Sequence, residues 1–395
     1  MKALVEKFIG IIFKGIGLFH SSKTIYFESF HGTQFSDNPK AIYEWMKQEY
    51  PEYHLVWGVN KGQEKPFRDE KVSYVLRFSI KWFLTMPRAA VWVINTRTPL
   101  WLTKNKKTTY LQTWHGTPLK KIGRDIESIS IPGYTKESYD QSFTEESKRW
   151  NYLVSPNFYS TEIFKGAFDF HGPVLEIGYP RNDILTKSKD NPVIKTKLKE
   201  KMGLPTNKRI ILYAPTWRET ANRKDGKYSF DTEFPFDDVM ESVDENTLVL
   251  VRMHYLVAKE IDFTQLDERI IDVSESYDMS ELLAISDLLI TDYSSSFFDY
   301  AITDSPILFF MPDKKNYEEE IRGFYFPIED CLPGPIAETK KELIDRITQW
   351  HSNEAIKNKN YEQFKDEFTS LEKGNASKYI AETIIKKGVT PDGNY

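Results

Sequence analysis

The stretch TTYLQTWHGTPLKKIG, residues 108–123, joins a β-prone run to a polar turn. Threonine and aromatic side chains in residues 108–114 favour a strand. His115 follows directly, and Gly116 then allows a ligand to approach the backbone closely. The same layout of an apolar run before polar residues recurs in YAPTWRE (213–219), VLVRMHY (249–255) and LLITDYSSSFFDY (288–300). Ligands of open α/β sheets bind at the carboxyl ends of the strands, so this layout predicts such a sheet.

Short β-prone runs alternate with helical patterns over most of the chain, which predicts an α/β fold with parallel sheets built from βαβ units. A first series of expected strands covers 24–28, 54–59, 90–95, 108–114, 151–155 and 174–178. A second series covers 209–214, 247–252, 269–274, 287–291 and 306–310. Helical patterns lie between them, for example at 38–50 and 279–287.

Two such series predict two doubly wound domains. We expect an amphipathic helix at 1–22, a first domain at 23–188, a polar linker at 189–208 and a second domain at 209–395. If the two sheets face each other, their polar strand ends line one cleft.

Composition excludes several classes of protein. The formal net charge of -5 argues against a nucleic-acid binder, which would carry a basic surface. The one cysteine, Cys331, permits no intrachain disulfide and fits a reducing compartment. The absence of a cysteine–histidine cluster predicts no zinc site.

The first 19 residues, MKALVEKFIGIIFKGIGLF, are apolar but carry Lys2, Glu6, Lys7 and Lys14. These charges interrupt the run of about 20 apolar residues that a spanning helix needs. At about 100° per residue the apolar side chains fall on one broad arc. This pattern predicts a helix that lies on an anionic membrane surface. The alternative is an ordinary helix packed on the protein's own core.

Two histidines are the candidate acid–base groups. Histidine titrates near neutral pH, so His115 suits proton transfer, although a histidine in a turn also serves as a structural hydrogen-bonding group. His254 and Arg252 lie on the same face of a strand end, where together they suit a phosphate. The alternative for this pair is a salt-bridged strand end.

Hydroxyl groups at two expected helix starts suit phosphate oxygens. Asp292 or Ser294 could cap a helix that begins near Ser295, and the free N–H groups there favour an anion. The hydroxyls of Ser294, Ser295 and Ser296 add donors, although plain capping explains the same residues.

The second helix start contains Ser280 and Glu281. Glu281 could accept hydrogen bonds from a ribose or stabilise the first helical turn. Thr216, Arg218 and Arg181 add a hydroxyl and two guanidinium groups suited to phosphate.

These groups together favour a pyrophosphate-containing donor. The chain has no GxxxxGK[ST] loop, no GxGxxG after a strand and no GxSxG, which argues against P-loop, dinucleotide-binding and α/β-hydrolase sites. It also lacks an Asp-x-Asp pair, so we expect stabilisation by Arg, His and helix dipoles, with no bound metal and no cofactor.

The stretches TWHGTPLK (113–120), GYPRND (178–183), YAPTWR (213–218), VLVRMHY and TDYSSSFFDY (291–300) resemble the CDP-glycerol glycerophosphotransferase family of wall teichoic acid synthesis. The resemblance runs from about residue 24 to about residue 380. YFESFHG (26–32), MPRAAVWVINTRTP (86–99) and RGFYFPIEDCLPGP (322–335) resemble its short, single-module members.

The resemblance implies a GT-B fold, with two Rossmann-like domains and the active site between them. It implies a CDP-glycerol donor, or CDP-ribitol in close relatives. The implied acceptor is an undecaprenyl-diphosphate-linked disaccharide that carries glycerol phosphate, at the cytoplasmic face of the cell membrane. The implied partners are this lipid, the anionic membrane surface and other teichoic acid enzymes.

Carried over by position, the resemblance makes His115 the base and His254 its catalytic companion. The resemblance implies that these residues lie around the donor: Arg181, Pro215, Thr216, Arg252, Met253, His254, Met279 and Ser280. We expect the following residues to bind the donor as well: Gly116, Thr117, Pro118, Leu119, Arg218, Glu281, Ser294, Ser295 and Ser296. Tyr255 stands where many members have proline, which affects local shape only.

Other functions compete with this interpretation. A GT-B glycosyltransferase would also hold a nucleotide diphosphate at helix N-termini and would release UDP from a nucleotide sugar. A membrane-docked scaffold with a decayed site is the non-enzymatic alternative, and the intact His115, Arg252 and His254 count against it.

Overall fold

The computed structural model describes residues 2–129, 133–216, 223–224, 227–228, 234–253, 262–314 and 323–388. The chain forms two compact units. Unit 1 contains the residues up to Thr117, Ile122–Asp183 and the residues from Leu371 onward. Unit 2 contains Pro118–Lys121 and Ile184–Ser370.

Unit 1 is built on a seven-stranded parallel sheet in the order β3-β2-β1-β4-β5-β6-β7. Its strands are β1 (Ser21–Glu28), β2 (His54–Val59), β3 (Tyr74–Leu76), β4 (Ala89–Ile94), β5 (Thr109–Gln112), β6 (Tyr152–Ser155) and β7 (Val174–Glu176). The strand order reverses between β1 and β4, which is the point where doubly wound sheets bind ligands.

Helices cover both faces of this sheet because successive strand residues point to opposite sides. Ile25 and Phe27 of β1 pack in one core, while Tyr26 between them packs in the other. The first core includes side chains of α2 (Asp37–Glu49), α3 (Lys65–Asp69) and α16 (Ala376–Gly388). The second includes side chains of α1 (Lys2–Ile16), α4 (Ile80–Thr85), α5 (Lys136–Ser147) and α6 (Phe158–Phe168).

Unit 2 repeats this strand order in a six-stranded parallel sheet, β12-β11-β8-β13-β14-β15. Its strands are β8 (Arg209–Tyr213), β11 (Thr247–Val251), β12 (Ile270–Asp272), β13 (Leu288–Thr291), β14 (Ile307–Phe310) and β15 (Ile336–Ala337). A separate antiparallel pair joins β9 (Arg223–Lys224) and β10 (Lys227–Tyr228). The order of the main sheet reverses between β8 and β13.

The helices that follow Asn182 belong mainly to unit 2. They are α7 (Asp183–Lys189), α8 (Pro192–Lys201), α9 (Phe236–Glu241), α10 (Met279–Ile285), α11 (Ser296–Tyr300), α13 (Ile328–Cys331), α14 (Lys340–His351) and α15 (Tyr361–Phe368). Side chains of α9 and α14 share a core with the β8 and β11 strands. The prediction of an α/β fold with two parallel sheets is therefore confirmed.

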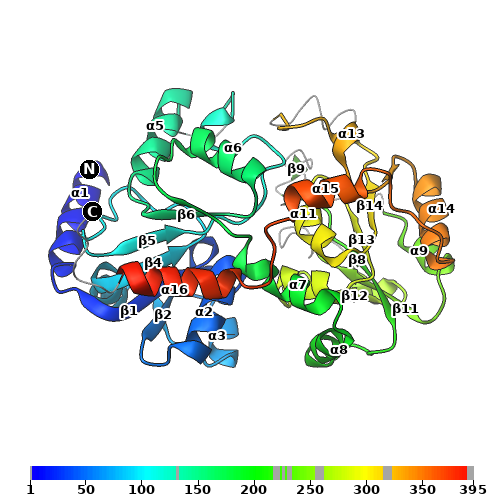
Figure 1. Ribbon diagram of the computed structural model, residues 1–395, viewed down its shortest axis with the longest axis horizontal. Coiled ribbons are helices and arrows are strands. Elements are labelled where there is room, and N and C mark those ends of the chain that lie inside the picture. The colour runs from blue at the N-terminus through cyan, green and yellow to red at the C-terminus, as the bar shows by residue number, and fades with distance from the viewer. Residues whose placement is uncertain are drawn as a thin grey trace. The chain divides into compact units, whose positions relative to one another are not determined.

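The units divide the chain differently from the expected boundaries. Residues from Leu371 onward were expected in the second domain, but α16 packs against the unit 1 sheet (Figure 1). Ile380, Ala381 and Ile384 are buried in that core, and the Asp183 carboxylate accepts bonds from the first N–H groups of α16. Sequence patterns detect helices but not the sheet against which a distant helix packs.

A short segment next to His115 is also grouped apart from its neighbours. Pro118–Lys121 belongs to unit 2 because its backbone bonds to the segment around Phe324. The Lys121 N–H donates to the Gly323 carbonyl at 2.8 Å, and the Tyr325 N–H donates to the Leu119 carbonyl at 3.1 Å.

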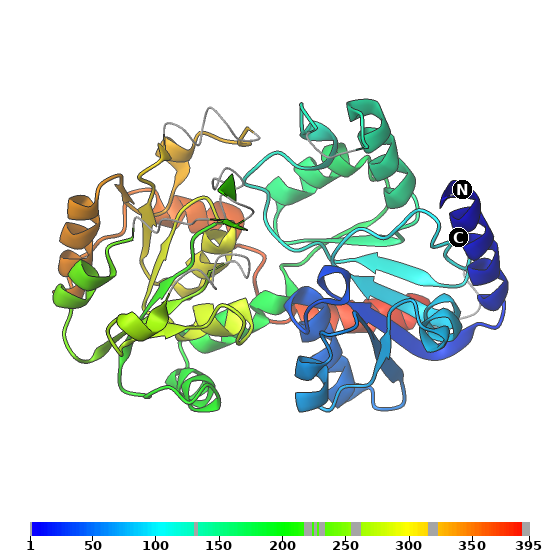
Figure 2. The ribbon, with the colours of Figure 1, turned by 180° about the vertical axis from the view of Figure 1, so that it is seen from behind.

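Helix α1 lies against unit 1 (Figure 2), and Phe13 is its side chain in the unit 1 core. Phe13 is fully buried among aromatic rings, including Trp82 at 5.7 Å between ring centroids. Gly10 lies so close to the Trp101 carbonyl that a Cβ would come within 2.9 Å of its oxygen. Large apolar side chains on the rest of α1 and just after it are exposed: Leu4, Val5, Phe8, Ile11, Ile12, Leu18 and Phe19. Among the described helices, none is long and apolar enough to cross a bilayer.

We predict that Asp183→Ala lowers the free energy of unfolding by about 1–2 kcal/mol, the usual cost of losing a helix cap. The Asp183 carboxylate is buried and accepts from the N–H groups of Ala376 and Ser377, both at 2.9 Å. Urea unfolding followed by circular dichroism measures the loss, with the exposed Asp190→Ala as the control. Equal midpoints for both variants would show that this carboxylate does not hold α16.

Candidate functional site

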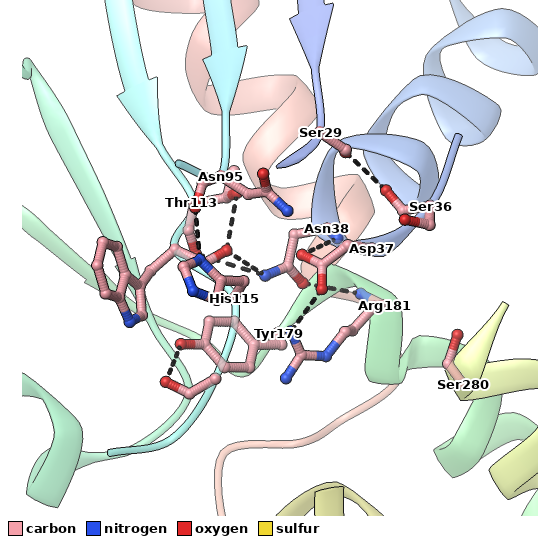
Figure 3. Close-up of polar contacts among 12 residues, drawn as sticks. Ser29, Ser36, Asp37, Asn38, Asn95, Thr113, His115, Tyr179, Arg181 and Ser280 are labelled. Carbon is pink, nitrogen blue, oxygen red and sulfur yellow. Dashed lines mark hydrogen bonds and ion pairs between the residues drawn. The ribbon is translucent and has the colours of Figure 1, made fainter. Parts of the chain in front are cut away.

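His115 lies just beyond the carboxyl end of β5, and one hydrogen bond sets the role of its ring. Its Nδ1 lies 2.7 Å from the backbone carbonyl oxygen of Asn95, which follows the neighbouring strand β4 (Figure 3). A carbonyl only accepts, so Nδ1 carries the proton and donates it. In the neutral ring, Nε2 is then left with a lone pair that can take a proton.

Two aromatic rings restrict the His115 imidazole. The Trp114 ring is stacked on it at 4.5 Å between centroids, and the Phe30 ring meets it edge-on at 5.6 Å. The ring orientation is therefore set by packing as well as by the bond to Asn95.

Burial is the main cause that lowers the pKa of His115 below its usual 6.5. Asp37 and the bond to Asn95 act in the opposite direction, while Arg181 lowers the pKa further. The neutral imidazole therefore predominates at pH 7, which is the form that a general base requires.

The turn before His115 is clamped by the side chain of Asn38 from the start of α2. Its Nδ2 donates to the carbonyls of Thr113 at 3.4 Å and Trp114 at 3.1 Å (Figure 3). Trp114 has φ +50°, in a region that residues other than glycine seldom adopt. Such strain persists only where surrounding contacts hold it, and it is concentrated at functional sites.

Arg181 supports the same turn through a buried ion pair. Its guanidinium lies 2.8 Å from the Asp37 carboxylate, and both side chains are 10% exposed. Its backbone N–H donates to the Asn38 side-chain oxygen at 3.2 Å. In this structure Arg181 thus positions the start of α2, and it lies in the same unit as His115.

The residues after His115 are held below the surface. Gly116 is buried and its carbonyl accepts from the Tyr179 hydroxyl at 3.1 Å. Thr117, Pro118 and Leu119 are buried as well, with Pro118 and Leu119 in unit 2.

A second group of predicted residues gathers at the strand ends of unit 2. Thr216 follows β8 and Asp292 follows β13, the two strands between which the order reverses. The Asp292 carboxylate accepts from the Thr216 N–H at 2.8 Å and from its hydroxyl at 2.9 Å. Pro215 lies directly before this contact and is half-buried.

Arg252 follows β11 and braces the loop before α10. Its guanidinium donates to the carbonyls of Val273 and Ser276. Burial lowers the pKa of Arg252, against the effect of the Asp278 and Asp272 carboxylates. The neighbouring Met253 packs its side chain into the unit 2 core, and its backbone N–H donates to the Ser274 hydroxyl at 3.0 Å.

The start of α10 is capped by its own aspartate. The Asp278 carboxylate accepts from the Ser280 N–H at 3.2 Å and from its hydroxyl at 3.0 Å, while Met279 is half-buried at the first helical position. Glu281 pairs with Lys201 of α8 at 2.9 Å. This ion pair is a structural role that the sequence did not indicate for Glu281.

The serine run leads into the short helix α11, which begins at Ser296. The Ser294 hydroxyl lies 3.0 Å from that of Ser296 and accepts from the Ser296 N–H at 3.3 Å. Ser295 occupies the cap position without a side-chain cap bond.

Two predicted residues, Arg218 and His254, lie outside the described residues. Within the described ranges, no three His, Cys, Asp or Glu side chains gather as metal ligands would.

Sequence reasoning missed the residues that hold His115: Asp37, Asn38 and Asn95. Asn95 ends an expected strand, so the rule that polar strand ends form sites would have included it. Asp37 and Asn38 appear in the sequence only as an ordinary helix start before Pro39, and their contacts are with distant residues.

A model of the family described as CDP-glycerol:poly(glycerophosphate) glycerophosphotransferase matches residues 13–386. A teichoic acid glycerol-phosphate transferase of Staphylococcus aureus is 46% identical over 389 residues, 98% of this chain and 99% of the relative. A teichoic acid poly(glycerol phosphate) polymerase of Bacillus spizizenii is 43% identical over 97% of this chain and 98% of the relative.

Solved structures of the wall teichoic acid polymerase TagF share the fold. One has a TM-score of 0.86 at 38% identity, over 97% of this chain and 94% of the solved chain. Another, a histidine variant soaked with CDPG, has a TM-score of 0.84 at 38% identity, over 94% of this chain and 90% of the solved chain. A Listeria monocytogenes protein, a putative UDP-N-acetylglucosamine 2-epimerase, is 13% identical with a TM-score of 0.53 and shares the fold alone, over 95% of this chain and all of that one.

The predicted family is therefore confirmed, and with it the prediction of a glycerophosphotransferase enzyme of teichoic acid biosynthesis. From the match over residues 13–386 and the identities above 40% to full-length relatives, the chain belongs to the CDP-glycerol:poly(glycerophosphate) glycerophosphotransferase family.

Proposed function

We propose that this chain transfers glycerol phosphate from CDP-glycerol to a polyprenyl-diphosphate-linked disaccharide that carries glycerol phosphate, and releases CMP. The observation that carries the proposal is the His115 ring, whose Nδ1 is held by the Asn95 carbonyl while Nε2 remains an acceptor. A neutral imidazole held in this way suits removal of a proton from an acceptor hydroxyl.

In the proposed reaction the acceptor's terminal hydroxyl gives its proton to His115 Nε2 as its oxygen attacks the glycerol-bearing phosphorus. The bond from that phosphorus to the oxygen of CMP breaks, and CMP leaves with the electron pair. Charge develops on the phosphoryl oxygens and on the leaving oxygen, where donors and cations stabilise it.

The donor diphosphate is assigned to the strand ends of unit 2. Thr216, Ser280 and the serine run lie at that edge of the sheet, where in this structure Thr216 bonds to Asp292, Ser280 to Asp278 and Ser294 to Ser296. Arg252 supplies positive charge next to α10. Arg218 and His254 are proposed to assist, on the strength of their positions in the family's pattern. This assignment also proposes the GT-B arrangement, in which each unit contributes one substrate site.

Glycerol is favoured over ribitol as the donor's polyol. The relatives named for glycerol phosphate include the 46% and 43% identical proteins. Those named for ribitol phosphate are 26% and 25% identical. The residues that select the polyol are therefore expected to follow the more similar group.

The exposed apolar side of α1 is proposed to bind the cytoplasmic face of an anionic membrane, where the lipid acceptor resides. Exposed side chains near α1 extend this surface: Phe78, Ile80, Leu84 and Leu100. Lys7, Lys14 and Lys81 are exposed among them and suit anionic headgroups. Phe13 attaches α1 to the unit 1 core, so the exposed side chains proposed to bind the membrane can be replaced without removing this attachment.

We predict that His115→Ala folds normally and loses at least about 100-fold in kcat, the lower end of what general base catalysis contributes. CMP release from CDP-glycerol with a synthetic lipid acceptor measures it. His54→Ala, at the opposite end of a unit 1 strand, is the control. Near-normal turnover of the His115 variant would refute its assignment as the base.

The same base predicts a pH dependence. Burial lowers the pKa of His115 below 6.5. We therefore expect kcat/KM to stay constant as the pH is lowered to 6.5 and to decrease at lower pH, where protonation removes the base. A pH profile of the wild-type enzyme with an acid limb centred above 6.5 would contradict this prediction.

Thr216→Val keeps the side-chain volume but removes the hydroxyl that bonds to Asp292. We expect the KM for CDP-glycerol to rise roughly 2- to 10-fold, the range of one hydrogen bond, with the KM for the lipid acceptor unchanged. Thr348→Val on the exposed side of α14 is the control. A change in the KM for the acceptor alone would refute the assignment of Thr216 to the donor site.

Replacing Leu4, Phe8 and Ile11 together by serine should weaken binding to phosphatidylglycerol vesicles at least about 100-fold, because each apolar side chain adds about 1.5 kcal/mol or more on burial. Phe13 stays in place, so the fold is kept. Vesicle cosedimentation measures binding, and Val193→Ser is the exposed apolar control. Turnover of a water-soluble acceptor should not change. Undiminished vesicle binding would contradict the proposed surface.

A further inference from the structure

The proposed reaction leaves unused a strained turn at Phe30–Gly32, directly after β1. Phe30, His31 and Gly32 all have positive φ, at 46°, 57° and 79°. A non-glycine residue in this region costs about 1–3 kcal/mol of conformational free energy, and such residues are concentrated at functional sites. Phe30 and His31 are two of them in succession.

Hydrogen bonds from three other segments hold this turn. The Phe30 N–H donates to the Asn95 side-chain oxygen at 2.9 Å, and the His31 N–H donates to the Thr96 hydroxyl at 3.4 Å. The Gly32 carbonyl accepts from the Asn60 N–H at 2.7 Å. Arg77 donates to the His31 carbonyl. The backbone is thus fixed, while the His31 side chain is exposed to solvent.

The turn lies beside the proposed base. β1 and β4 are the strands between which the order of the unit 1 sheet reverses, and the turn and Asn95 follow them. Asn95 joins the two features, because its side chain holds Phe30 and its carbonyl holds His115. The Phe30 ring also contacts the His115 ring.

Two guanidinium groups, those of Arg77 and Arg97, lie near His31. Burial of part of the ring lowers the pKa of His31, and so do Arg77, His115 and Arg97, in that order. Each guanidinium is paired with a buried carboxylate, Arg77 with Glu28 at 3.1 Å and Arg97 with Glu146 at 2.7 Å. The exposed imidazole of His31 is therefore the group that can donate an N–H to a phosphate oxygen of a ligand.

The same edge holds a donor without a partner. Asn95 is fully buried, and its side-chain Nδ2 makes no hydrogen bond within the described residues. Because its Oδ1 is used by the Phe30 N–H, the amide cannot turn over to remove the deficit. Buried polar groups of this kind call for an explanation, and ligand oxygens are one.

We propose that His31 binds the phosphate of the acceptor's terminal glycerol phosphate and so places that unit's free hydroxyl at His115. This inference rests on the proposed function and assigns the acceptor side of the same site. The phosphate and the terminal hydroxyl of glycerol phosphate are separated by a three-carbon chain. One such unit can therefore meet the two neighbouring imidazoles together. His31 then acts in positioning, and His115 takes the proton.

The test variant is His31→Gly, because glycine adopts the left-handed conformation without strain and only the imidazole is lost. Two synthetic lipid acceptors are compared, one ending in glycerol phosphate and one with the bare disaccharide. We expect the KM for the phosphate-bearing acceptor to rise at least about 10-fold, as for one lost charged hydrogen bond. The KM for CDP-glycerol should not change.

Controls separate binding from folding. His171→Gly, an exposed histidine in the loop before β7, should behave as the wild type on every readout. His31→Asn keeps a donor in a residue that tolerates positive φ, so it should recover part of the lost affinity. Thermal melts of all variants should coincide.

Three results would overturn the inference. They are an unchanged KM in His31→Gly, an equal rise for both acceptors, and a loss confined to kcat at saturating acceptor. A wild-type protein that releases no CMP from CDP-glycerol with either acceptor would instead refute the proposed function, so the two failures are distinguishable.

Discussion

The hydrogen bond from His115 Nδ1 to the Asn95 carbonyl is the interaction on which the proposed chemistry depends. It exists because β4 and β5 pair in parallel, with Ile94 beside Gln112, so that the residues just past both strands meet at one edge. The bond selects the tautomer and leaves Nε2 as an acceptor. A shift of this register by one residue would turn His115 or Asn95 to the other face of the sheet.

Around this bond, buried polar side chains hold the segments that follow the strands, where no regular sheet hydrogen bonds remain. Asn38 holds the carbonyls of Thr113 and Trp114, and the pair of Asp37 with Arg181 holds the start of α2. Removing one partner of a buried pair leaves an uncompensated charge, so these residues constrain geometry strongly although they touch no reacting atom. Arg181, which is predicted to contact the donor, pairs with Asp37 in this structure and so supports the turn that carries the proposed base.

Much of the fold was predictable because buried parallel strands are continuous apolar runs. Four strands were not predicted: β3 has three residues, and β9, β10 and β15 have two each, too few for a pattern to appear. For the site, the rule of polar strand ends led to His115, Thr216 and Arg252. The residues that position them escaped because each contact joins segments far apart in sequence, as Asn38 and Trp114 do.

The sequence by itself determined the class of fold, the family and the types of side chain at the strand ends, since these follow from local hydrophobic pattern and residue identity. Only the tertiary structure decided which nitrogen of His115 carries the proton, that Phe13 anchors α1 while its neighbours stay exposed, and that α16 returns to unit 1. The physical reason is that the tautomer, the exposure and the packing partner each depend on atoms that folding brings together. A local sequence pattern does not specify which distant residues come into contact.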